Sequence, residues 1–173
     1  FHEAIPGHHL QNALNLENDN LSLYRRFGYY TSAFGEGWAL YSERLSLEIG
    51  LANDPYDELG VLQSELFRAV RLVVDTGMHF KRWTREEAMD YMKKITGMSD
   101  TEVTVEIERY IVWPGQACSY KVGMLKILEL REKAKQELGE NFDIRDFHSA
   151  VLDHGEPPLF IVEELVSEMT NNR

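Results

Sequence analysis

Apolar residues recur along the chain at intervals of three and four positions, and strict alternation of apolar and polar residues is scarce. The first spacing is typical of helices with one buried face, and alternation would indicate strands. The pattern therefore predicts an all-α protein. The expected helices span residues 2–17, with a disturbance at Pro6 and Gly7, and residues 21–27, 33–50, 56–79, 84–96, 100–112, 115–139, 143–153 and 158–170.

Local signals mark several of these boundaries. Thr84 is followed three residues later by Glu87, and Ser99 by Glu102, which is the spacing of a capping box at a helix start. A stripe of apolar residues follows one side of the helix expected over residues 56–79, and we expect this stripe to face the core. Its members are Leu59, Leu62, Leu66, Ala69, Val70 and Val73.

Composition and charge narrow the class of protein. The 173 residues are 43% hydrophobic and 27% charged, and no repeat or linker divides them, so we expect one domain over residues 1–173. Lys and Arg number 18 against 29 Asp and Glu, and this net charge of -11 argues against a nucleic-acid partner. No apolar run approaches the roughly 20 residues of a membrane span, so we expect a soluble protein. The single Cys118 excludes an internal disulfide and leaves the compartment open, cytoplasmic or exported.

The chain opens with "FHEAIPGHHLQ", which carries three closely spaced histidines. Zinc proteases of the thermolysin type use His-Glu-x-x-His, because residues four apart on a helix share a face and can hold one ion. His2 and Glu3 fit this motif, but His8 and His9 come too late. On a straight helix His2 and His8 would point about 240° apart, so they could not chelate one ion.

Pro6 and Gly7 offer a way to restore the spacing. Proline disturbs the helical hydrogen bonds and glycine accepts almost any backbone angles, so the pair can loop out of the helix. Without these two residues the sequence reads His-Glu-Ala-Ile-His, which predicts a Zn²⁺ site with His2 and His8 as ligands. His9 is an alternative to His8. A histidine-rich surface helix or a tag remnant would also explain these residues.

A second segment, "GEGWALYSERL", strengthens the case for a metal site. It places Glu36 and Glu43 seven residues apart on one face of an expected helix, which Trp38 and Tyr41 would anchor. The alternative is that both glutamates are solvated and only the aromatic residues matter.

These segments, with "ERYIVWPGQACSYKVG" and "DFHSAVLDHGEPPLFIVEE", resemble the C-terminal portion of the bacterial domain-of-unknown-function family 885, whose members resemble gluzincin metallopeptidases. The resemblance covers nearly the whole chain and implies a zincin-like bundle of helices. Family members are much longer and the chain has no initiator Met, so we expect a fragment whose missing N-terminal part supplies the rest of any cleft.

"EGWALYSE" is also similar to the segment that supplies the third zinc ligand in aminopeptidase-N-like enzymes. This similarity implies Glu36 as the ligand and Glu43 as a group that orients a ligand histidine. The implied activity is hydrolysis of a peptide substrate, with Glu3 as the base that takes a proton from water and delivers it to the leaving amine. The rival hypotheses are a non-catalytic helical domain that binds metal or peptide and a purely structural bundle.

Further site residues are expected from distant parts of the sequence. A Tyr or His across the cleft commonly donates a hydrogen bond to the transition state, and Tyr120, His148 and His79 are candidates; His79 is also a candidate alternative ligand. Arg109 precedes the break at Pro114 and could bind the terminal carboxylate of a peptide, or it could pair with a neighbouring glutamate. Core packing would explain the tyrosine and both histidines equally well.

Overall fold

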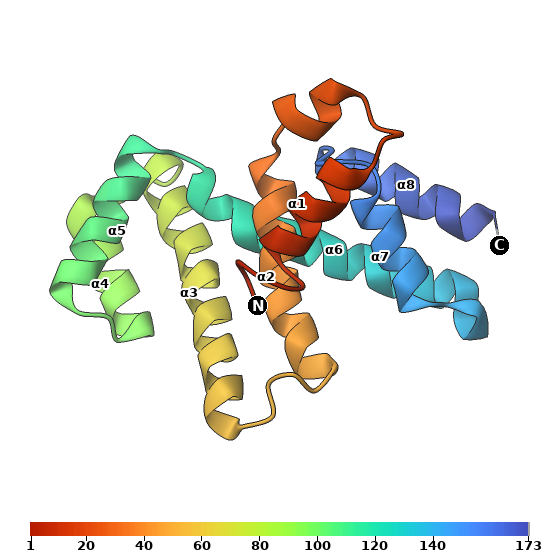
Figure 1. Ribbon diagram of the computed structural model, residues 1–173. Coiled ribbons are helices and arrows are strands. Elements are labelled where there is room, and N and C mark those ends of the chain that lie inside the picture. Colours follow the sequence, from red (N-terminus) through yellow and green to blue (C-terminus); the bar gives the residue numbers. More distant parts are fainter. Residues whose placement is uncertain (173) are drawn as a thin grey trace.

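The structure is a computed structural model that describes residues 1–172, which form helices and turns and no strand (Figure 1). The all-α prediction is confirmed. The α-helices are α1 (His8–Glu17), α2 (Ser32–Glu48), α3 (Pro55–His79), α4 (Arg85–Thr96), α5 (Asp100–Val112), α6 (Gln116–Leu138), α7 (Ile144–Leu152) and α8 (Leu159–Asn171). Two short elements are the π-helical turn η1 (Tyr24–Gly28), where a helix over 21–27 was expected, and the 3-10 turn η2 (Gly139–Asn141).

The predicted bounds of α2 to α8 agree with the structure within two residues. Both predicted capping boxes are present: the Thr84 side chain accepts a hydrogen bond from the Glu87 amide, and the Ser99 side chain accepts one from the Glu102 amide. Each glutamate bonds back to the amide of its cap residue. These boundaries were predictable because a capping box involves only residues within one turn.

Helix α6 connects two hydrophobic clusters. In Figure 1 it begins beside the group formed by α3, α4 and α5 and ends beside α7 and α8. One cluster lies among α2, α6, α7 and α8, and it includes Phe34, Trp38, Tyr41, Met124 and Phe147. The other lies among α3, α4, α5 and the start of α6, and includes Val74, Met92, Ile107 and Tyr110. Both α2 and α3 pack on α6, so side chains from these three helices can meet.

The crossing of α2 and α6 depends on two glycines. A Cβ atom built on Gly37 would lie 2.5 Å from the Cα of Gly123, and one built on Gly123 would lie 1.9 Å from the carbonyl oxygen of Ala33. Neither distance leaves room for a methyl group, so the two backbones touch directly. This close approach brings Glu36, next to Gly37, close to the first turns of α6.

The first helix begins at His8, so the prediction of a helix from residue 2 is wrong. A proline has no amide hydrogen and its ring clashes with the preceding turn, which explains why regular helix does not continue through Pro6. The backbone nevertheless folds back on itself: the His8 amide bonds to the His2 carbonyl at 2.8 Å, and the His9 amide to the Glu3 carbonyl at 3.0 Å. Each of these hydrogen bonds joins residues six apart, whereas an α-helical bond joins residues four apart. The turn before α1 therefore contains two residues more than a helical turn.

Most of the apolar stripe predicted for the core on α3 is exposed, so that prediction is wrong for its leucines and Val73, whereas Val70 is buried in the core as expected. Leu59 and Leu62 are each 51% exposed, Leu66 is 43% exposed and Val73 is 36% exposed. The buried side of α3 includes Val70, Arg71 and Val74. Apolar periodicity shows which side of a helix is apolar, but it does not show whether a neighbouring helix covers that side.

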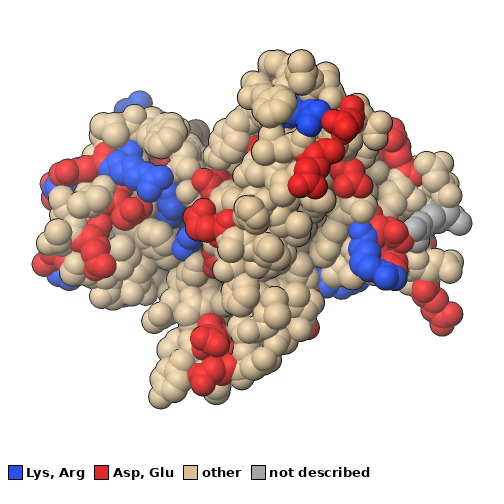
Figure 2. Space-filling model, viewed as in Figure 1, with Lys and Arg blue, Asp and Glu red and all other residues tan. Residues whose placement is uncertain are grey.

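Charged side chains are dispersed over the surface. On the face shown in Figure 2, Asp and Glu side chains spread over several elements, and Lys and Arg side chains lie in small separate groups. Within residues 1–172, none of the helices combines the length and the apolar character that crossing a membrane requires.

Candidate metal centre

The segment before α1 is held against α2 by two hydrogen bonds to one carbonyl. The indole Nε1 of Trp38 donates to the Pro6 carbonyl at 2.9 Å, and the hydroxyl of Ser42 donates to the same oxygen at 3.2 Å. Both donors are buried residues of α2. Because these bonds fix the turn at Pro6, the imidazoles of His2 and His8 both face α2.

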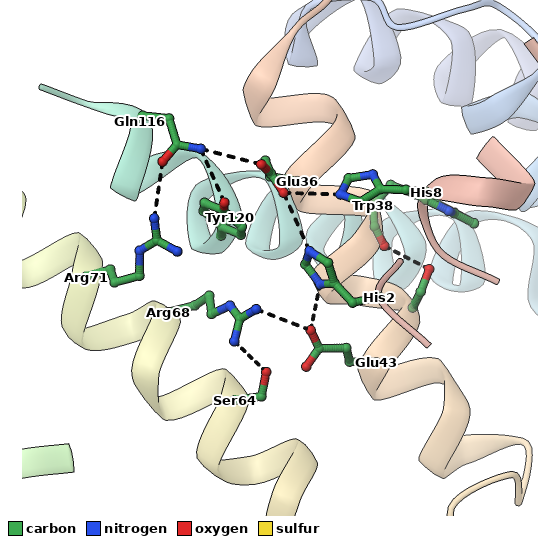
Figure 3. Close-up of polar contacts among 11 residues, drawn as sticks. His2, His8, Glu36, Trp38, Glu43, Ser64, Arg68, Arg71, Gln116 and Tyr120 are labelled. Atoms are coloured by element: carbon green, nitrogen blue, oxygen red, sulfur yellow. Dashed lines mark hydrogen bonds and ion pairs between the residues drawn. The ribbon is translucent and has the colours of Figure 1, made fainter. Parts of the chain in front are cut away.

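His2 and His8 converge on the carboxylate of Glu36 (Figure 3). Glu36 Oε2 lies 3.3 Å from His8 Nε2 and 3.6 Å from His2 Nε2. The two imidazole rings are 5.0 Å apart and nearly perpendicular. Ligand atoms of a tetrahedral zinc ion, each about 2.0–2.1 Å from the metal, lie about 3.4 Å from one another. The distances from Glu36 to the two imidazoles match this spacing, and two imidazoles with a carboxylate are donors that zinc prefers.

Glu43 contacts the other nitrogen of His2. Its Oε1 lies 2.6 Å from His2 Nδ1, and because an ionised carboxylate only accepts, Nδ1 is the donor. Arg68 lies 3.8 Å from the same oxygen and donates to the hydroxyl of Ser64 at 2.7 Å. A carboxylate that holds the second nitrogen of a metal-binding histidine fixes the orientation of its ring.

The surrounding charges change the pKa values of the three side chains. Burial disfavours the charged form of His2, but the hydrogen bonds to Glu36 and Glu43 outweigh it and raise the pKa of His2 to about 9. The hydrogen bond to Glu36 raises the pKa of His8 as well. Burial alone would raise the pKa of Glu36, but its bonds to His2, His8 and Tyr120 lower it well below the usual range. Glu36 is therefore an anion at neutral pH.

Glu3 lies beside the two histidines. One ligand atom from each of His2, Glu3 and His8 can be chosen so that all three lie within 4.8 Å of one another. The side chain of Glu3 is exposed, so water can reach it, and so is the side chain of His9. Of the two neighbouring histidines, His8 lies 3.3 Å from Glu36, whereas the His9 side chain faces solvent.

Tyr120 approaches the centre from α6. Its ring lies 6.1 Å from that of His2 with an angle of 21° between the planes. The side-chain amide of Gln116, one turn earlier, donates to the Tyr120 hydroxyl at 3.2 Å and lies 3.4 Å from Glu36 Oε1. A hydroxyl at this position can donate a hydrogen bond into the space next to Glu36.

A cavity of about 530 Å³ opens next to Glu36. Its walls include Gln116, Tyr30, Arg109 and Trp113, so Arg109 belongs to the surroundings of the centre. The guanidinium of Arg109 lies 6.0 Å from the centroid of the Trp113 ring, and its partner Glu106 is 3.9 Å away. A cation held this loosely by one carboxylate can interact with an anionic group in the cavity.

His148 and His79 lie elsewhere. His148 Nε2 shares a hydrogen bond of 2.8 Å with the Tyr41 hydroxyl, and its ring packs edge-on against Trp38. Burial and the nearby Arg131 lower the pKa of His148 to about 4, so it is neutral at pH 7. His79 is an exposed residue at the end of α3, and its Nε2 lies 3.0 Å from the Tyr110 carbonyl. The structure therefore brings neither histidine to the candidate metal centre.

The model of a family described as bacterial proteins of unknown function (DUF885) matches residues 1–166. The chain belongs to the DUF885 family. No curated protein matches it. The resemblance noted in the sequence is thus confirmed for the family, and its metallopeptidase part stays a prediction.

Two solved structures share the fold of this DUF885 chain. A "putative lipoprotein" from Colwellia psychrerythraea is 55% identical with a TM-score of 0.95, over 99% of this chain and 29% of the relative. A "putative lipoprotein of unknown function" from Shewanella oneidensis is 32% identical with a TM-score of 0.88, over 96% of this chain and 30% of the relative. The DUF885 chain thus spans less than a third of either relative.

The sequence alone gave no role to several polar residues that surround the candidate metal centre. These residues are Gln116, Ser64, Arg68 and Arg71. The spacing of Arg68 and Arg71, three residues apart on one helix, places them on one face, but only packing shows that this face meets Glu43 and Gln116.

Proposed function

We propose that this part of the DUF885 protein is the catalytic region of a zinc-dependent peptide hydrolase. The observation that carries the proposal is the convergence of His2 and His8 on Glu36 at 3.6 and 3.3 Å, from segments separated by more than 25 residues in sequence. Hydrogen bonding of His2 Nδ1 to Glu43 supports it, because that contact leaves Nε2 directed at the proposed ion position.

A zinc ion held by His2, His8 and Glu36 would supply Lewis acidity to the peptide carbonyl and lower the pKa of water toward about 7. The exposed carboxylate of Glu3 takes the proton of the attacking water and returns it to the leaving amine. The Tyr120 hydroxyl donates to the carbonyl oxygen as negative charge develops there. These roles use side chains that lie within one cluster in the structure.

The substrate in this proposal is a peptide that lies in the cavity next to Glu36. Arg109 on the cavity wall offers a cation for a carboxylate of the peptide, and Trp113 offers an apolar surface. Further walls of the cleft come from other parts of the polypeptide, since this chain spans only 29% of its solved relative from Colwellia psychrerythraea.

Metal analysis of the purified natural protein together with one variant tests the proposal. We expect about one zinc ion per chain, and we expect Glu3→Gln to keep the zinc and lower kcat on peptides by about 100- to 10,000-fold. Glu17→Gln is the matched control, because Glu17 is an exposed glutamate at the end of α1. Zinc binding without turnover would instead indicate a non-catalytic binding domain, and a protein without zinc affinity would indicate a structural bundle.

A further inference from the structure

Gln116 lies at the junction of three contacts around the proposed centre (Figure 3). Its Oε1 accepts a hydrogen bond from Arg71 Nη2 at 3.2 Å. Its Nε2 is 3.2 Å from the Tyr120 hydroxyl and 3.4 Å from Glu36 Oε1. The side chain thus links α3 to α6 and to the metal centre, a role that the proposed chemistry above does not use.

The contact with Arg71 decides which way the Gln116 amide points. A side-chain amide has one accepting oxygen and one nitrogen with two hydrogens, whereas a guanidinium only donates. Arg71 therefore holds the oxygen of Gln116 on its own side, and both hydrogens of the nitrogen are left for Tyr120 and Glu36. In the reverse orientation the amide nitrogen would face the guanidinium, donor against donor.

Arg71 is an unusual residue for such a place. It is 3% exposed, and its Nε has no hydrogen-bond partner within residues 1–172. Its guanidinium carbon instead lies 4.3 Å from the ring centroid of Tyr120 and 5.3 Å from that of Tyr110. A buried cation usually has a carboxylate partner, since desolvation is costly. Here the partners are aromatic rings and one neutral amide, which suggests that this cation serves to orient the amide and the phenol.

The oriented amide in turn determines what the Tyr120 hydroxyl can do. Because Gln116 donates to the phenol oxygen, the hydroxyl hydrogen cannot be given to Gln116 and points to another acceptor. The Tyr120 ring also lies beside the His2 ring, with 6.1 Å between their centroids, so the phenol borders the metal centre on the side away from Gln116.

We propose that Gln116 and Arg71 are positioning residues that aim the hydroxyl hydrogen of Tyr120 at the carbonyl oxygen of a bound peptide. This inference rests on the proposed peptidase function. Arg71 orients Gln116, Gln116 occupies the acceptor position of the phenol, and Tyr120 donates its hydrogen bond to the oxygen on which charge develops. Neither positioning residue contacts the reacting atoms.

A double-mutant cycle in the complete natural protein tests the inference. Gln116→Leu keeps a similar volume and removes both hydrogen-bonding groups, and Tyr120→Phe removes the hydroxyl. We expect Gln116→Leu to lower kcat by about 10- to 100-fold with little change in KM, because only the transition state loses an interaction. In the Tyr120→Phe background the same substitution should change kcat by less than about 3-fold, because the group on which it acts is absent.

Two readouts do not depend on turnover. At saturating zinc, we expect Gln116→Leu to hold about one zinc ion per chain and to weaken binding of a phosphinic peptide, whose charged oxygens resemble the transition state. Arg71→Lys, which keeps the charge and loses the planar set of donors, should have a smaller effect of the same kind. Gln136→Leu is the matched control, because Gln136 is an exposed glutamine on the same helix.

The outcomes separate the inference from the function on which it rests. A wild-type protein that neither binds zinc nor cleaves peptides overturns both. If the wild type cleaves peptides and the losses from Gln116→Leu and Tyr120→Phe multiply, Gln116 does not act through Tyr120 and the inference is wrong. If saturating zinc restores the kcat of Gln116→Leu to the wild-type value, Gln116 acts only by holding the ligand Glu36 and the inference is wrong.

Discussion

His2 donates from its Nδ1 to Glu43 at 2.6 Å, the shortest polar contact of the candidate centre. Glu43 is only 7% exposed, so this hydrogen bond forms in a largely water-free environment. The contact fixes the rotation of the imidazole and leaves Nε2 facing Glu36. The orientation of His2 therefore depends on a residue that is not one of the proposed ligands.

The first prediction concerns Glu43. In Glu43→Gln the side chain keeps its shape and loses its charge, so His2 becomes a weaker ligand and Arg68 loses its carboxylate partner. We expect zinc affinity to fall by about 10- to 100-fold, measured by competition with a chelator of known affinity. Glu17→Gln should have no effect, and an unchanged zinc Kd in Glu43→Gln would argue against an orienting role for Glu43.

A second prediction separates the two neighbouring histidines. His8→Ala removes a proposed ligand, so bound zinc should fall far below one ion per chain when measured by mass spectrometry of the metal. His9→Ala changes an exposed side chain and should retain the full zinc content. Equal losses in the two variants, or a loss in His9→Ala alone, would contradict the arrangement around Glu36.

A third prediction concerns the contact between α2 and α6. Gly123→Ala adds a methyl group where the carbonyl oxygen of Ala33 lies, so the two helices must move apart. We expect the free energy of unfolding in urea to fall by about 1–3 kcal/mol. Because the shift displaces α2, zinc affinity should fall as well.

Gly60→Ala is the control for this substitution. Gly60 lies within α3, and a Cβ atom built there meets nothing within 4 Å. Alanine is favoured over glycine inside a helix by about 0.5–1 kcal/mol, so Gly60→Ala should stabilise the protein. A Gly123→Ala variant as stable as the wild type would show that the helices have room to separate there.

The fourth prediction is a pH dependence of stability from His148. Burial lowers the pKa of His148 to about 4, whereas an unfolded histidine has a pKa of about 6.5. Between these pH values the unfolded state binds a proton that the folded state does not bind. The neutral His148 therefore contributes to stability above about pH 7. This contribution is lost as the pH falls, and the loss is complete below about pH 4. The full loss is about 3 kcal/mol.

Urea unfolding of the wild type and His148→Gln between pH 7.5 and 4 measures this contribution. The difference in unfolding free energy between the two proteins should change across the range, because glutamine does not titrate. Other titrating groups affect both proteins alike and cancel in the difference. A constant difference at all pH values would show that His148 has an ordinary pKa.

Much of the secondary structure could be predicted because its causes are local. The capping boxes at Thr84 and Ser99 involve residues three positions apart, and the bounds of α2 to α8 follow from such signals and from apolar spacing. The start of the first helix was misjudged: the two extra residues at Pro6 and Gly7 were recognised, but the helix was expected from residue 2 and begins only at His8. The outward orientation of Leu59 and Leu62 was missed because the stripe alone does not show what packs against it.

The sequence by itself determined the helices, the two-residue interruption before α1 and the presence of histidines and glutamates with metal-binding chemistry. Only the tertiary structure decided that His8 rather than His9 meets Glu36, that His148 and His79 lie elsewhere, and that Gln116 joins the centre. The physical reason is that the residues of the centre lie far apart in the sequence, so local signals do not show which of them meet. Helical hydrogen bonds join residues four apart, whereas the contact between Glu36 and Gln116 joins residues 80 apart and exists only because α2 and α6 touch at two glycines.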